Sequence, residues 1–322
     1  MCQPEITVII PCYNNYKYMR RCLESLERQQ YKNFEVIVVD DCSTDDSYHQ
    51  LKMYTQKSSL DMAVISNKIN KGPGASRNEG IRYAKGRWVT FCDADDWYPE
   101  DRLKKISEKT DGVDCILCNY TKVYLSGKEE PVDYISKIKH TANKNDIIVA
   151  SLMSFGVCAV RKEIAERFPI AALYNGEDYA TMPIWLQNSN RIEMIDESLY
   201  FYYMRENSAS RKPSKNAFGG LCNAFWYMSS KSLPKFAVST EFLGIHYILY
   251  GAVLVAIKAG VAKTNIEKAV SDFEQKYPLW YENVYIKTLP HYKQFFLKSV
   301  KRKRFTPIKV MTRIHRLLLK LK

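Results

Sequence analysis

The stretch Arg87-Trp-Val-Thr-Phe-Cys-Asp93-Ala-Asp95-Asp96 decides how the N-terminal half of this chain folds. It predicts a buried strand over 87–91 that runs directly into three carboxylates. Carboxylates packed this closely repel one another unless a cation shares their charge. A hard divalent ion such as Mg²⁺ or Mn²⁺ is usually bound where the protein supplies so few oxygens, because diphosphate oxygens complete its coordination. The alternative is a solvated acidic turn after a strand.

Strand and helix signals alternate on both sides of this stretch. Apolar runs at 6–10, 34–39 and 62–66 predict three more strands, and helix-like segments lie between them at 16–29, 43–56 and 74–85. Ser43 or Thr44 is a suitable cap for the second of these helices. Such alternation indicates βαβ units and a mostly parallel sheet flanked by helices, an α/β, Rossmann-like class.

A polar cluster follows each of the four strands, at 11–14, 40–43, 67–77 and 93–96. Open α/β sheets bind ligands outside the carboxyl ends of their strands, beside helix N-termini. Four such clusters on one edge indicate a nucleotide site.

Composition bounds the class of protein. The 322 residues are 46% hydrophobic, enough for a sizeable core. Nine cysteines are scattered, and Met1–Glu5 lacks both a basic and an apolar region of a secretory signal, so we expect a reducing cytoplasm. Cys115 and Cys118 form a lone CxxC inside an apolar run, which favours core packing over a zinc or redox site.

The net charge of +13 belongs to the C-terminal end, because twelve Lys or Arg and no Asp or Glu follow Glu282. Residues 307–322 predict a basic amphipathic helix, preceded by Lys301-Arg-Lys-Arg304, that suits an anionic membrane surface. The alternatives are a terminal helix docked on its own domain and, ranked below both, nucleic-acid binding, which we do not expect.

Residues 240–257 predict a strongly apolar helix whose apolar run is short of a bilayer span. We interpret it as a buried helix, with a membrane-spanning segment and membrane contact over 240–258 as the alternatives. We expect two domains, a catalytic domain over 1–215 and a smaller helical region over 216–322.

Taken together, the motifs resemble the inverting glycosyltransferases of family 2, which have the GT-A fold and use nucleotide-diphosphate sugars. The resemblance covers roughly 5–211 and rests on motifs whose order and spacing are more specific than any one alone. They are Val8-Ile-Ile-Pro-Cys-Tyr-Asn14, Val36-Ile-Val-Val-Asp-Asp-Cys-Ser43, Asn70-Lys-Gly-Pro-Gly-Ala-Ser-Arg-Asn-Glu-Gly80, Gly86–Asp96, Gly176-Glu-Asp178, Leu199-Tyr-Phe-Tyr-Tyr203 and Ser208-Ala-Ser210.

The resemblance implies where the nucleotide binds. Asp41 matches the acid that accepts a hydrogen bond from the pyrimidine base, and the backbone around Pro11 and Tyr13 would line that base. Arg77, in the first turn of a glycine-introduced helix, would face phosphate. A turn-forming Asp41 and an ordinary surface Arg77 are the alternatives.

The same resemblance implies the metal and sugar contacts. Asp93 and Asp95 match the family's DxD pair: Asp95 would bind Mn²⁺ or Mg²⁺, and Asp93 the ribose or a metal-bound water. The ion would stabilise the charge that builds on the departing nucleoside diphosphate. Asp96 extends the cluster and is a candidate contact of the donor sugar.

Inversion needs a base opposite the leaving group, because the attacking hydroxyl must lose its proton. Asp178 matches the family's catalytic base, and Glu177 beside it completes the ED motif; a helix N-terminal acid is the alternative. Trp185 is a candidate part of the acceptor platform, with core packing as the favoured alternative.

The chain departs from the family at one position. Tyr203 stands where the family often has an arginine, and Arg205 is a candidate substitute. No Walker A loop, GxGxxG or metal-ligand spacing of histidines is present in the sequence, which argues against a P-loop ATPase or a dinucleotide dehydrogenase.

The resemblance therefore implies a metal-dependent inverting glycosyltransferase on the cytoplasmic face of the membrane. It would move a sugar, from a UDP-sugar in particular, to a saccharide or lipid-linked acceptor in surface polysaccharide synthesis. The alternatives are a sugar-nucleotide nucleotidyltransferase and a catalytically silent membrane-associated assembly partner. The sequence names neither the donor sugar, the acceptor and linkage, nor the oligomeric state.

Overall fold

The computed structural model describes residues 3–151, 153–173, 175–205 and 213–308. The chain divides into two compact units, residues 1–207 and 208–322. The helix expected over 307–322, and Ser208 and Ser210, lie wholly or mainly outside the described residues.

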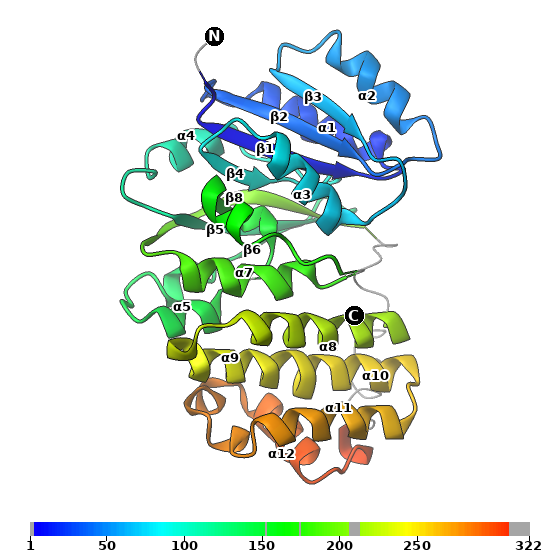
Figure 1. Ribbon diagram of the computed structural model, residues 1–322, viewed down its shortest axis with the longest axis vertical. Helices are drawn as coiled ribbons and strands as arrows, with labels where there is room; N and C mark the ends of the chain where they lie inside the picture. Colours follow the sequence, from blue (N-terminus) through cyan, green and yellow to red (C-terminus); the bar gives the residue numbers. More distant parts are fainter. Residues whose placement is uncertain (1–2, 152, 174, 206–212, 309–322) are drawn as a thin grey trace. The chain divides into compact units, whose positions relative to one another are not determined.

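The first unit is built on one eight-stranded sheet (Figure 1). The strands follow the order β3-β2-β1-β4-β7-β5-β6, with β8 beside β5. Their bounds are β1 Ile6–Cys12, β2 Phe34–Asp40, β3 Met62–Ser66, β4 Trp88–Phe91, β5 Cys115–Tyr124, β6 Glu129–Val132, β7 Cys158–Arg161 and β8 Ile192–Met204.

Parallel pairing joins β1 to β2 and β4, β2 to β3, and β5 to β8. Strands β6 and β7 run antiparallel to their neighbours. The expected α/β sheet is therefore confirmed, with a mixed second half. All residues of β2 and β4 are buried, as a sheet covered on both faces requires.

Helices connect these strands. Their bounds are α1 Tyr16–Glu27, α2 Ser47–Thr55, α3 Pro73–Tyr83, α4 Arg102–Ser107, α5 Lys144–Ala150, α6 Lys162–Arg167 and α7 Glu177–Asn188, with short 3₁₀ turns η1 Ile135–Lys137 and η2 Phe155–Val157. Helix α3 packs closely on β1 at Gly80, where a Cβ atom would lie 2.4 Å from Cγ2 of Ile9. Only glycine permits this approach, which fixes α3 over the sheet.

The expected cap of α2 is wrong. The helix begins at Ser47, and Asp46 precedes it without a side-chain cap. The Oγ of Ser43 instead accepts a hydrogen bond from the backbone N–H of Asn14 at 3.0 Å, and the N–H of Thr44 donates to Oδ1 of Asn14 at 2.8 Å. These residues join the loops after β1 and β2, because a tertiary contact satisfies the polar groups that a cap would have used.

The second unit is helical. Its elements are α8 Lys215–Lys231, η4 Pro234–Phe236, α9 Ala237–Gly244, the π-helical η5 Ile245–Ala252, α10 Val253–Ala259, α11 Lys263–Lys276, η6 Trp280–Glu282, η7 Val284–Thr288 and α12 His291–Lys301. Among the described residues, one helical run, Pro234–Ala259, is long and apolar enough to cross a membrane, and 56% of its most apolar window is buried inside the fold. It packs against α8, α11 and α12, as the interior helix of a bundle does (Figure 1).

Candidate active site

The carboxyl ends of β1, β2 and β3 bring the first three polar clusters side by side. The N–H of Asp41 donates to the carbonyl of Cys12 at 2.7 Å, and that of Asn67 to the carbonyl of Asp40 at 2.8 Å. Pro11 is half-buried in β1, and Tyr13 just beyond it is 46% exposed. An accessible aromatic ring therefore borders this edge of the sheet.

Asp41 is buried, and its carboxylate holds the loop that leads into α3. Its oxygens accept hydrogen bonds from Nδ2 of Asn67 at 2.8 Å, from the N–H of Lys71 at 3.0 Å and from the N–H of Gly72 at 2.7 Å. Within the protein Asp41 therefore stabilises a turn, as the turn-forming alternative predicted, by accepting hydrogen bonds from the backbone that leads into α3. The contact to a pyrimidine base remains a prediction.

Arg77 is the residue that joins the two acidic motifs. Its guanidinium is only 6% exposed and donates to Oδ1 of Asp93 at 2.6 Å and to Oε1 of Glu177 at 2.9 Å. Burial opposes the charged guanidinium, but Asp93 and Glu177 outweigh that penalty and raise the pKa of Arg77. Arg77 is therefore no ordinary surface arginine. The sequence placed it against phosphate, and the structure places it against carboxylates 16 and 100 residues further along the chain.

Asp95 lies beside a second arginine. Oδ2 of Asp95 forms an ion pair with Nε of Arg205 at 2.6 Å, and its side chain is 15% exposed. Burial and the nearby Asp93 raise the pKa of Asp95, while Arg205 lowers it. The Nη2 group of Arg21 also donates to the Asp95 carbonyl at 3.1 Å. Arg205 therefore lies beside Asp95, and its role as the substitute for the family's arginine stays a prediction.

The expectation that Asp96 contacts the donor sugar is wrong for this structure. Asp96 is 1% exposed, and both of its oxygens are occupied: Oδ2 accepts from the Tyr200 hydroxyl at 2.6 Å and Oδ1 from the N–H of Tyr203 at 2.7 Å. Burial raises the pKa of Asp96, and Asp95 and Asp93 raise it further. The carboxyl group of Asp96 therefore holds the loop of residues 93–96, the acidic loop, against β8.

Glu177 and Asp178 occupy the first turn of α7 behind Gly176, which has a φ of 81°. Glu177 is buried against Arg77, whereas the side chain of Asp178 is partly accessible. Burial and the neighbouring charge of Glu177 raise the pKa of Asp178 to about 7. A carboxylate with this pKa is suited to accept a proton near neutral pH.

Trp185 does not form an acceptor platform. Its side chain has no accessible surface, and its Nε1–H donates to the carbonyl of Phe168 at 2.8 Å. The indole stacks on Phe91 with ring centroids 5.9 Å apart and packs on Phe155 at 5.2 Å. Core packing, the favoured alternative, is what the structure shows. Cys115 and Cys118 are likewise buried in the core.

Sequence reasoning missed Arg21 and Tyr200. The guanidinium of Arg21 lies 3.5 Å from the ring centroid of Trp97 and 4.4 Å from that of Tyr203. The hydroxyl of Tyr200 accepts a hydrogen bond from the N–H of Asp93 at 3.2 Å in addition to holding Asp96. The available signal was Tyr203, which stands where the family often has an arginine, because an aromatic ring at that place can bind a cation supplied by another residue.

The described residues contain no group of three or more His, Cys, Asp or Glu side chains arranged to hold a metal ion. The acidic loop instead supplies two carboxylates, Asp93 and Asp95, each beside an arginine. This donor set of hard oxygens fits Mg²⁺ or Mn²⁺, which keep several waters and take further ligands from substrate phosphates.

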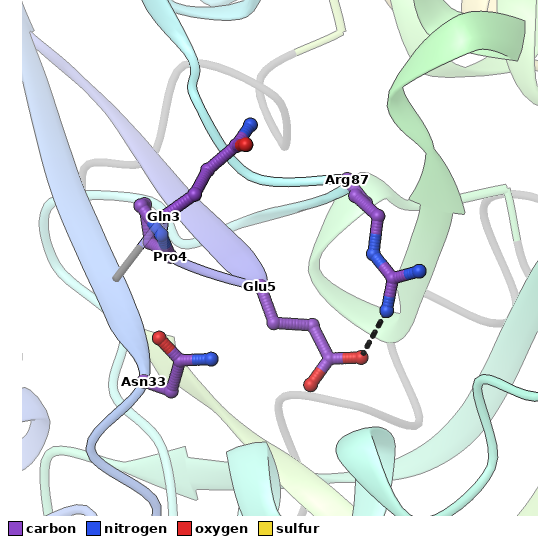
Figure 2. A pocket seen from close by; sticks show the side chains of 5 residues that line it. All are labelled: Gln3, Pro4, Glu5, Asn33 and Arg87. Atoms are coloured by element: carbon purple, nitrogen blue, oxygen red, sulfur yellow. Dashed lines mark hydrogen bonds and ion pairs between the residues drawn. The ribbon is translucent and has the colours of Figure 1, made fainter.

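A small hollow of about 150 Å³ lies at the opposite, amino-terminal edge of the sheet. Figure 2 shows Glu5 and Arg87 facing each other there, 3.2 Å apart. Since its charged groups pair with one another, this hollow adds no candidate for the site.

The sequence profile described as glycosyl transferase family 2 matches residues 7–168, half of the chain. The chain belongs to this family. The matched residues are therefore a glycosyltransferase domain, which argues against the nucleotidyltransferase alternative.

Two curated members of the family illustrate the sequence relationship. Glycosyltransferase GlyA of Streptococcus pneumoniae serotype 4 is 33% identical over 227 residues, which are 64% of this chain and 32% of GlyA. The poly(ribitol-phosphate) beta-N-acetylglucosaminyltransferase TarS of Staphylococcus aureus is 32% identical over 209 residues, 62% of this chain and 35% of TarS. The chain thus matches about a third of the length of each.

Solved structures share the fold. Residues 1–349 of S. aureus TarS match with a TM-score of 0.71 at 23% identity, over 97% of this chain and 91% of that one. The same TarS fragment has been solved in complex with UDP and with UDP-GlcNAc. The mannosyltransferase PcManGT from Pyrobaculum calidifontis, solved with GDP-Man and Mn²⁺, matches with a TM-score of 0.60 at 17% identity, over 95% and 88%. These likenesses place the sheet of the first unit in the GT-A fold.

Proposed function

We propose that this glycosyltransferase is metal-dependent and inverting, and that it moves a sugar from a UDP-sugar to a saccharide or lipid-linked acceptor in surface polysaccharide synthesis. One observation carries the proposal: Arg77 joins Asp93 to Glu177 at the carboxyl edge of the sheet. This contact brings the acidic loop after β4 and the first turn of α7 into one site. The donor's leaving group and the attacking hydroxyl would then meet between them.

Asp178 is the proposed base. In an inverting displacement, the acceptor hydroxyl loses its proton as it attacks the anomeric carbon, so the base must be ionised and within reach. Its pKa of about 7 leaves a useful fraction of the carboxylate ionised at neutral pH while keeping it basic enough to take the proton. Glu177 has a different task, because its ion pair with Arg77 holds α7 and the base in place.

Asp95 is the proposed metal ligand, with Asp93 nearby for the ribose or a metal-bound water. Mn²⁺ or Mg²⁺ at this place would stabilise the negative charge of the departing nucleoside diphosphate. Arg205 pairs with Asp95 in the structure and would bind a diphosphate oxygen once that carboxylate holds the metal ion. The PcManGT complex with Mn²⁺ supports metal use in a protein of the same fold.

Asp41 is the proposed contact of the donor's pyrimidine ring, which Pro11 and Tyr13 would line. Arg77 would face the phosphates. The TarS complexes with UDP and UDP-GlcNAc support a uridine donor. We further propose that the catalytic domain spans 1–215 and that the helical region over 216–322 supplies acceptor recognition. The basic end of that region would dock the enzyme on the cytoplasmic face of the membrane.

A thermal-shift panel tests the nucleotide site. We expect UDP, but not GDP, CDP or TDP, to raise the melting temperature with Mn²⁺, and EDTA to remove the shift. Ligand at a hundred times its Kd adds roughly 2.7 kcal/mol, which is readily measured. The Asp95→Asn variant should lose the metal-dependent shift. No shift with any of the four nucleotides would refute the proposed site.

Sugar transfer tests the base. We expect Asp178→Asn to lower turnover at least ~10²-fold while the UDP shift is unchanged. Asp111→Asn is the matched control, because Asp111 is an exposed aspartate of the same unit. Normal turnover of Asp178→Asn would show that another group takes the proton.

A further inference from the structure

The second unit contains a hollow of about 560 Å³ at the C-terminal end of α10. Its floor is apolar, with Ile257, Val261, Ile266 and Phe305 among the lining residues. Ile266 and Phe305 are 3% and 5% exposed, so the floor belongs to the packed interior of the bundle. Pockets of this size hold small organic ligands.

The rim of the hollow is cationic. Lys263, Lys303 and Arg304 line it, and no Asp or Glu does. Lys263 pairs with Glu267 at 3.3 Å. Within the described part of the chain, no carboxylate pairs with Lys303 or Arg304.

The backbone fixes two of these cations. Lys303 has a φ of 52°, a left-handed conformation that a residue other than glycine adopts rarely. The N–H of Lys303 donates to the carbonyl of Val300 at 2.8 Å, and that of Arg304 to the carbonyl of Ser299 at 2.9 Å. The chain therefore turns sharply after α12 and sets both side chains beside the apolar floor.

Charge identifies the occupant. The sequence beyond Ile308 carries five Lys or Arg and no Asp or Glu, so its side chains offer no carboxylate to Lys303 and Arg304. A ligand must combine an anion for Lys303 and Arg304 with an apolar part for Ile257 and Phe305. We propose that the hollow binds one anionic phospholipid, with the phosphate at the cationic rim and the first methylenes of a chain on the floor.

Binding of a soluble short-chain lipid tests this assignment. We expect dioctanoyl phosphatidylglycerol, titrated calorimetrically below its micelle concentration, to bind the full chain. Glycerol phosphate, which lacks the acyl chains, and dioctanoyl phosphatidylcholine, which has no net charge, should bind at least tenfold more weakly. Equal binding of glycerol phosphate would overturn the lipid assignment in favour of a free phosphate site. Equal binding of phosphatidylcholine would show that the rim does not select charge.

Two variants locate the site. Lys303→Ala with Arg304→Ala should weaken binding roughly thirtyfold, because each basic residue contributes about one kcal/mol near a lipid phosphate. The matched control, Lys231→Ala with Lys287→Ala, removes two exposed charges of the same unit outside the hollow and should change binding less than twofold. Val261→Trp fills the floor without changing charge and should abolish binding. Unchanged affinity in the rim double variant would refute the proposal, and none of these outcomes depends on the nucleotide site.

Discussion

Replacing Arg77 by methionine should cost the protein about 3–4 kcal/mol of its free energy of unfolding. Glu177 would keep a charge on a side chain that is 12% exposed, and an uncompensated buried charge costs about 3 kcal/mol or more. Asp93 contributes less than about 1 kcal/mol, because its side chain is 44% exposed and water screens it. Most of the loss therefore comes from Glu177.

A double variant makes this reasoning specific. Arg77→Met with Glu177→Gln removes the unpaired charge as well, so it should recover at least half of the lost stability. Arg82→Met is the control: Arg82 lies on the same helix and pairs with Glu79 at the surface, where water screens the pair and its loss should change stability little. Urea unfolding followed by circular dichroism measures all three variants. A loss below about 1 kcal/mol for Arg77→Met, or a double variant no more stable than the single one, would refute the argument.

Three further outcomes are expected. Because the base must be ionised, a pKa of about 7 at Asp178 predicts that kcat/KM falls about tenfold for each pH unit below 7 and levels off above it; a rate constant unchanged down to pH 5 would contradict the assignment. Tyr200→Phe leaves Asp96 without its hydroxyl donor and should lower the free energy of unfolding by about 1–3 kcal/mol, with a higher KM for the donor; a change in neither would show that the acidic loop holds its place without Tyr200. Deleting 301–322 should move the protein from the membrane to the soluble fraction, and an unchanged distribution would count against the basic end as an anchor.

The N-terminal strands were predictable because each is a run of apolar, largely β-branched residues. The predicted ranges 6–10, 34–39, 62–66 and 87–91 fall on β1 to β4. Strands β6 and β7 were not predictable, since each has four residues and β6 contains two glutamates and a proline. Their antiparallel direction depends on partners far along the chain, as in the pairing of Trp88 with Arg161.

The residue types of the site were predictable, but their contacts were not. The pattern predicts Asp93, Asp95 and Asp178 as the chemically important acids, and the structure places Asp178 in the first turn of α7. It did not reveal that Arg77 holds Asp93 and Glu177 at once, because no local signal reports a contact across 100 residues. The sugar contact predicted for Asp96 failed because exposure is a property of the folded protein, and its side chain is enclosed. Trp185 is enclosed too, as its favoured interpretation, core packing, predicted.

The way Asp41 is held has a consequence for altering donor choice. Its oxygens are bound by the amides of Lys71 and Gly72, and Gly72 immediately precedes the helix that carries Arg77. A residue with a side chain at position 72 would be strained at its φ of 84° and would move both ends of this segment. The proposed pyrimidine contact at Asp41 and the ion pairs of Arg77 with the two acidic motifs should therefore shift together. Engineering of a new nucleotide preference should begin at Pro11 and Tyr13, which do not belong to this segment, and leave Asp41 unchanged.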